Sequence, residues 1–162
     1  MDRYKDGSVI VFTCIAGMVA PIVAFLTLFG NWVTLKMPFH LGAPRFHLLE
    51  FANASKKTAN VIQYFSSNVA AELNIMSLAA TISYWVLIIG GVISLVVSLM
   101  ILFAPKTEVL IFIPYVVIIA FAVIGLIFVV PMIITPGTIG VTAIPIVFLL
   151  VTCIPAVILR LL

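Results

Sequence analysis

Four long runs of apolar residues constrain this chain more than any other feature of its sequence. They cover about residues 9–29, 75–103, 109–134 and 139–159, and none has an Asp, Glu, Lys, Arg or His in its interior. About 20 residues of α-helix cross a hydrocarbon core of about 30 Å, so each run is long enough to span a membrane. The sequence therefore predicts an all-α integral membrane protein, a single domain in which four transmembrane helices pack as a bundle.

The composition excludes a water-soluble fold. Of the 162 residues, 65% are hydrophobic and 8% are charged, with a mean hydropathy of +1.40, whereas a soluble domain has about 25% charged residues. The first run has 21 apolar residues, more than the roughly 7 to 15 of a signal peptide, and we interpret it as a retained anchor. The expected partner is the lipid bilayer, and no nucleic-acid partner is expected.

The number of basic residues in the loops does not decide the orientation, because the two sides have four each. An even number of spans places both termini on one side, where Arg3, Lys5 and two other basic residues lie, and four basic residues lie on the other side. The first span usually dominates the orientation, and Arg3 and Lys5 directly precede it. We therefore expect cytoplasmic termini, an outer segment at residues 30–74, and a plasma-membrane location.

Small residues and prolines indicate how the spans pack. Helices in lipid associate where small side chains recur four apart, which predicts contacts along two short ladders. A proline within a span frees a backbone carbonyl, which a neighbouring Ser or Thr hydroxyl can satisfy. We interpret Cys14 and Cys153 as small apolar fillers. The two predicted contact ladders are Ala16, Ala20 and Ala24 in the first span, and Gly90, Ser94 and Ser98 in the second.

The segment 30–74 divides into two parts. Alternation at residues 33–37, the turn-formers of residues 38–44 and an aromatic stretch at residues 45–51 predict a short β-hairpin, with no helix before Ala54. From an N-cap at Ser55, apolar residues recur in steps of three and four. This pattern predicts an amphipathic stalk that continues without a break into the second span and ends at Pro105.

Two side chains are candidate anchors at the membrane interface, and three are candidate metal ligands. Trp32, after the first span, fits an interfacial aromatic belt, and Arg160 can extend its charge to the interface. His47 and Glu50 can present two ligands on one helical turn, and His40 can complete a facial set. No cofactor is predicted, although the sequence leaves a metal, quinone or lipid site open, with His40 and His47 as its first candidates.

The predicted topology resembles that of the claudin-like class. The shared features are four spans, cytoplasmic termini, a partly β-structured first outer loop, a short second outer loop and an aromatic residue after the first span. The cysteine pair that marks the first loop of that family is not present after Trp32, so the resemblance carries over no functional residue.

Three functions fit these features. The first is a non-catalytic accessory subunit of a larger membrane complex, for example a respiratory one, because little sequence lies outside the spans. The second is a claudin-like adhesive or homo-oligomeric protein. The third is a small carrier or channel for a neutral solute. An enzyme is not expected, because no Ser-His-acid, Cys-His or paired-carboxylate arrangement is discernible. The hydroxyl residues available to a neutral path are Thr81, Ser83, Ser94 and Ser98.

Overall fold

The computed structural model describes residues 7–35, 45–103, 108–134, 139–141 and 143–161, and within these ranges the chain forms five helices and one small sheet. Four of the described helices are long and apolar enough to cross a membrane, which indicates an integral membrane protein and confirms the predicted number of spans. The elements are α1 (Gly7–Leu28), β1 (Val33–Leu35), β2 (Arg45–Phe46), α2 (Leu48–Ile62), α3 (Ser67–Phe103), α4 (Glu108–Ile134), β3 (Ile139–Val141) and α5 (Ala143–Leu161).

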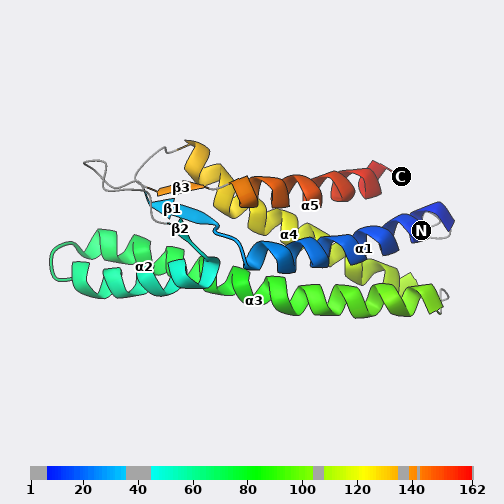
Figure 1. The fold of residues 1–162 in the computed structure, drawn as a ribbon, viewed down its shortest axis with the longest axis horizontal. Helices are drawn as coiled ribbons and strands as arrows, with labels where there is room; N and C mark the ends of the chain where they lie inside the picture. Colours follow the sequence, from blue (N-terminus) through cyan, green and yellow to red (C-terminus); the bar gives the residue numbers. More distant parts are fainter. Residues whose placement is uncertain (1–6, 36–44, 104–107, 135–138, 142, 162) are drawn as a thin grey trace.

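The four long helices lie side by side, with both ends of the chain at one end of the molecule and the sheet toward the other (Figure 1). Helix α1 contacts α3, α4 and α5, and α4 also contacts α3 and α5. Helix α2 contacts α3 and continues past the sheet, away from the termini (Figure 1). Among the described residues, one end of the molecule is therefore built from helices alone, and at the other end a sheet and an extra helix cover the spans.

The sheet has three strands in the order β2-β1-β3, all antiparallel. Val33 pairs with Phe46, which is the pairing expected of the predicted hairpin, and residues 36–44 lie outside the described part of the chain. The other edge of β1 pairs with β3, at the start of the predicted fourth span. That prediction was wrong for residues 139–141: pairing with β1 satisfies their backbone groups in an extended conformation, and α5 begins at Ala143.

The predicted continuous stalk is wrong. A helix already begins at Leu48, ends at Ile62, and is followed by a separate helix from Ser67 that lies alongside it. Ser55, expected as the N-cap, is buried in the middle of α2. The physical reason is tertiary: folding back lets α2 bury one apolar face against α3, which a straight stalk leaves in water.

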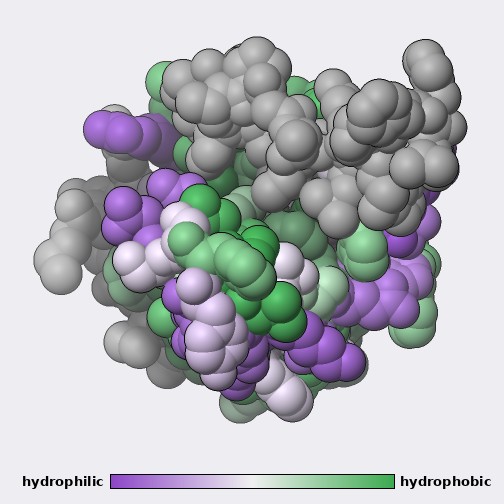
Figure 2. Space-filling view, turned by 90° about the vertical axis from the view of Figure 1, so that its left-hand side faces the viewer, coloured by the Kyte–Doolittle hydropathy of each residue, from purple (hydrophilic) through white to green (hydrophobic). Residues whose placement is uncertain are grey.

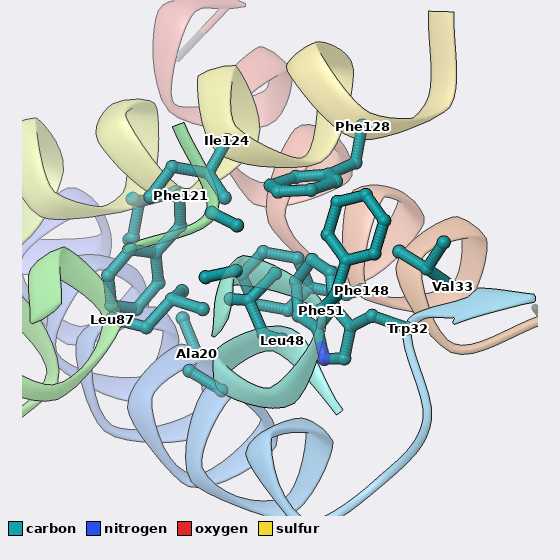
Figure 3. Close-up of a cluster of buried hydrophobic side chains, with 14 of the residues drawn as sticks. Ala20, Trp32, Val33, Leu48, Phe51, Leu87, Phe121, Ile124, Phe128 and Phe148 are labelled. Carbon is teal, nitrogen blue, oxygen red and sulfur yellow. The ribbon is translucent and has the colours of Figure 1, made fainter. Parts of the chain in front are cut away.

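Trp32 is fully buried rather than placed as an interfacial anchor (Figure 3). Its indole N–H donates to the Thr27 carbonyl oxygen at 2.8 Å, and its ring centroid lies 5.6 Å from that of Phe128 and 5.5 Å from that of Phe148. The backbone after α1 turns this side chain inward, where it closes the core shared by the spans, β1 and α2.

A buried hydrogen bond explains how α1 continues through Pro21. Proline has no N–H, so the carbonyl of Gly17, four residues earlier, has no helical donor. The Ser94 hydroxyl of α3 donates to that oxygen at 2.7 Å. A side chain at Gly17 would meet the Ser98 hydroxyl and Pro114, so the close approach of α1 to α3 at this level depends on glycine.

Candidate interaction site

Helix α2 and residues 67–83 of α3 form a helical hairpin, called the arm below. Tyr84 lines one shallow hollow together with Leu28 and Phe29 at the end of α1, so it is level with the end of the first span. The part of α3 from Tyr84 to Phe103 is about 30 Å long, which is the thickness of a hydrocarbon core. Residues 67–83 of α3 lie before that level. Because an α-helix rises 1.5 Å per residue, they extend the arm about 25 Å beyond Tyr84.

The aromatic residues around Tyr84 agree with this level. Phe29 is exposed, and Trp85 is 54% exposed on the outside of α3. Aromatic rings gather at the boundary of the hydrocarbon, so these residues fit an interfacial belt. Tyr84 therefore marks the level of α3 at which these aromatic residues gather.

Small side chains hold the two helices of the arm together. Ala52, Ser55 and Ala59 of α2 are buried, as are Ala70 and Ser77 of α3, and side chains of this size let two backbones approach closely. The Ser77 hydroxyl donates to the Ala52 carbonyl oxygen at 2.7 Å. The base of α2 also enters the main core through Leu48 and Phe51 (Figure 3). The arm is therefore a packed extension of the molecule.

The end of the arm is apolar and exposed. Tyr64 and Phe65 lie in its turn, 82% and 87% exposed, and Val61 and Val69 flank them and are also exposed. The turn is closed by the N–H groups of Phe65 and Ser66, which both donate to the Ile62 carbonyl oxygen at 2.8 Å. We call Val61, Tyr64, Phe65 and Val69 the aromatic tip. Figure 2 shows this end of the molecule, with hydrophobic atoms at its centre and hydrophilic residues around them.

Polar residues occupy part of the arm's outer surface on both of its helices. Lys56, Lys57 and Asn60 of α2 are exposed, as are Glu72 and Asn74 of α3. The arm is therefore amphipathic, with a polar face that suits water. The aromatic tip has the most exposed large side chains of the arm, so it gains the most free energy when another surface buries it.

The proposed metal ligands have a different role in the structure. His47 is the N-cap of α2, and its backbone N–H donates to the Glu50 carboxylate at 3.3 Å. The His47 ring Nδ1 lies 2.9 Å from the Gly30 carbonyl oxygen, which ties the start of α2 to the end of α1. His40 lies outside the described residues, and within the described ones no group of three or more His, Cys, Asp or Glu side chains comes together as a metal set.

The predicted packing residues divide between two contacts. Ala16, Ala20 and Ala24 are buried along α1, and Ser94 and Ser98 of α3 are fully buried. Gly90 differs, since a Cβ there would lie 3.2 Å from the Phe121 ring of α4, whereas its neighbour Gly91 faces Phe25 of α1. Of the remaining predicted residues, Arg160 is exposed in the last turn of α5, and Cys14 and Cys153 are free thiols.

The arm is the feature that sequence reasoning missed. Its signal was present, because Leu48, Phe51, Ser55 and Ala59 recur in steps of three and four, and this pattern begins before the predicted start at Ser55. Ser66, directly after two aromatic residues, marks the start of the second helix of the arm. Its carbonyl oxygen accepts a hydrogen bond from the Ala70 N–H at the start of α3. The aromatic residues Phe46 and Phe51 favoured a strand in the sequence. Phe46 does lie in β2, whereas Phe51 lies in α2, the helix that packs against α3.

No protein-family model, curated protein sequence or solved structure matches this chain.

Proposed function

We propose that this protein is a non-catalytic accessory subunit of a larger membrane complex, and that it holds a partner protein through the aromatic tip. The observation that carries the proposal is the exposure of Tyr64 and Phe65 at the end of a packed arm. Aromatic side chains in water gain free energy when a partner buries them, and they are enriched in the cores of protein interfaces. A packed arm also loses little conformational entropy on binding.

The surroundings of the aromatic tip suggest the chemistry of the partner. Lys56 and Lys57 are exposed on α2, about two helical turns before Tyr64. An apolar pocket with Asp or Glu side chains at its border complements both features, since opposite charges at the rim of an interface steer association. We therefore expect the partner to offer an apolar pocket with an acidic rim.

The proposal includes an orientation and a membrane. Four spans packed as a bundle anchor the chain in the plasma membrane, with cytoplasmic termini and the arm outside. It assigns no catalytic step and no cofactor to the chain, because His47 and Glu50 cap α2. The hydroxyls of Ser94 and Thr81 donate to backbone carbonyls, at 2.7 and 2.8 Å, and therefore lend no support to a carrier path.

The test is co-purification from native membranes in a mild detergent. The variant Tyr64→Ser/Phe65→Ser removes the aromatic tip without touching the spans. Asn74→Ser is the matched control, because Asn74 is exposed on the same arm outside the aromatic tip. Thermal unfolding of both purified variants should match that of the unchanged chain, since the substituted side chains are exposed.

We expect the unchanged chain and Asn74→Ser to bring out the same partner, and the tip variant to lose it. Recovery of the unchanged chain without any other protein contradicts the subunit proposal. Retention of the partner by a folded tip variant contradicts the assignment of the tip.

The second candidate is a claudin-like adhesive role, which the arm's reach of about 25 Å beyond the level of Tyr84 favours. In that case the aromatic tip meets a partner in a facing membrane. Vesicles carrying the chain then aggregate with one another, and the tip variant does not aggregate them. Vesicles that stay dispersed count against adhesion between copies, whatever co-purifies from native membranes.

A further inference from the structure

A second apolar surface runs along the outside of α3, separate from the aromatic tip. Nine large side chains follow one another in alternating steps of three and four residues, and each is between 46% and 88% exposed. We call this surface the α3 seam. Its members are Ile75, Leu78, Ile82, Trp85, Ile89, Val92, Val96, Leu99 and Phe103.

Part of the α3 seam belongs to the arm. Ile75, Leu78 and Ile82 precede the level of Tyr84 and so belong to the arm, where they remain exposed. Between residues 70 and 83 they are the only large apolar side chains that are exposed, and the other exposed positions are small or polar. Within residues 70–83 of α3, exposed large apolar residues are thus confined to positions that continue the pattern of the span, which favours a partner that covers this stretch together with the span.

We propose that two copies of this chain pair in parallel through the α3 seam. A repeat of 3.5 residues is the repeat of a left-handed coiled coil, in which the same positions of two helices meet. One set of positions is mostly β-branched and the other begins and ends with leucine. The first set is Ile75, Ile82, Ile89, Val96 and Phe103, and the second is Leu78, Trp85, Val92 and Leu99. This distribution favours a parallel pair of helices.

A second copy of the chain has the parallel orientation and the uncharged face that this contact requires. Two copies in one membrane have the same orientation, so their α3 helices are parallel and related by a twofold axis along the membrane normal. Residues 75–103 contain no charged side chain. Identical faces therefore meet without like-charge repulsion, and the contact is complementary to itself.

The α3 seam also has the size and shape of an interface. Its nine side chains expose on the order of 1,000 Å² per chain, and a standard interface buries about 800 Å² per partner. Around Gly90, an open apolar hollow of about 360 Å³ is lined by Thr81, Ile82, Trp85, Val86, Ile89 and Ile93. In the pair, this hollow receives a large side chain of the second copy, as knobs enter holes in a coiled coil.

The first test is cross-linking of single cysteines in liposomes that contain only this chain. In a background of Cys14→Ala/Cys153→Ala, the variants Ile82→Cys and Ile89→Cys place thiols on the α3 seam. Ile22→Cys on α1 is the matched control, since Ile22 is 51% exposed and Ile89 is 55% exposed. Under a mild oxidant we expect covalent dimers from both seam variants and at least tenfold less from Ile22→Cys.

The second test weakens the pair without touching the lipid-embedded part. Ile82→Lys puts like charges opposite each other in the arm, and Asn74→Lys is the control on an exposed position beside the seam. We expect Ile82→Lys to raise the dissociation constant of the dimer at least tenfold, by energy transfer between labelled copies in liposomes, and Asn74→Lys to change it less than threefold. Both variants should unfold at the temperature of the unchanged chain.

Equal cross-linking at Ile22 and Ile89 overturns the proposal, as does a monomer at every protein-to-lipid ratio. A cross-link that forms only in native membranes, to a different protein, overturns the assignment of a second copy. The aromatic tip is intact in all these variants, so loss of its partner and loss of the α3 pair are separate outcomes.

Discussion

The hydrogen bond from Ser94 to Gly17 leads to a prediction about Pro21. Because Pro21 has no N–H, the Gly17 carbonyl depends on the Ser94 hydroxyl, which donates to it at 2.7 Å. Ser94→Ala removes the donor and leaves a buried acceptor between α1 and α3. In the background Pro21→Ala, the new N–H at residue 21 can donate to the same carbonyl within the helix. The cost of Ser94→Ala should therefore fall when Pro21 is replaced.

The expected magnitude follows from the burial of the site. A buried acceptor without a partner costs about 1–3 kcal/mol, and measured hydrogen bonds between transmembrane helices reach about 1.7 kcal/mol. Ser94 is fully buried, so we expect Ser94→Ala to lower the free energy of unfolding by about 1–2 kcal/mol. In the Pro21→Ala background we expect a loss below about 0.5 kcal/mol, so the two sites couple by about 1 kcal/mol.

The assay is reversible unfolding in mixed micelles, with the double-mutant cycle completed by all four variants. Ser98→Ala is the matched control, because Ser98 is a fully buried serine one turn further along α3 whose hydroxyl has no hydrogen-bond partner among the described residues. Removing a hydroxyl without a partner should change the free energy of unfolding by less than about 0.5 kcal/mol, or raise it. Any difference between the two serines then reports the hydrogen bond.

Equal losses for Ser94→Ala in both backgrounds refute the reasoning. That result means that the hydroxyl does not compensate for the missing N–H of Pro21. A loss for Ser98→Ala as large as that for Ser94→Ala has the same meaning, because both changes then reflect only the packing of α1 on α3.

Three other predictions rest on single side chains. Gly17→Ala should cost about 1–3 kcal/mol of unfolding free energy, because its Cβ would lie 2.9 Å from that of Pro114. Gly7→Ala is the control and should be neutral, because a Cβ at Gly7 has nothing within 4 Å. Equal effects of the two substitutions would contradict the close-contact interpretation. Trp32→Ala should cost about 3–5 kcal/mol by the same measurement, and a loss below about 1 kcal/mol would favour an interfacial position instead. His47→Ala should cost about 1–2 kcal/mol through its contact with Gly30, and zinc should not raise the melting temperature of the unchanged chain; a rise that His47→Ala abolishes would restore the metal hypothesis.

The arm shows where prediction from sequence failed and why. The apolar spacing from Leu48 to Ala59 is a helical signal, but the aromatic residues beside it fit a strand equally well in isolation. Contact with α3, which includes the hydrogen bond from Ser77 to Ala52, decided between them. The candidate site is similar: exposed aromatic residues at 64 and 65 become noticeable only when the chain turns there and leaves them at the end of the arm.

The predictions for Trp32 and for residues 139–141 were wrong for the same reason. A tryptophan directly after a span is typical of an interfacial belt, and nothing local indicates that β1 turns it between Phe128 and Phe148. Residues 139–141 are apolar enough to continue into the fourth span. They form a strand because the free edge of β1 offers hydrogen bonds at that place.

The sequence by itself determined the four spans, their helical state and the lack of charge within them. These properties are local, because a hydrocarbon solvent requires each segment to satisfy its own backbone hydrogen bonds, and length and hydropathy are enough to meet that requirement. The tertiary structure alone decided that α2 folds back on α3, that Trp32 is buried, that Ser94 compensates for Pro21, and which side chains make up the tip and the α3 seam. Each of these depends on contacts between residues far apart in the chain, and such contacts form only when the helices have packed.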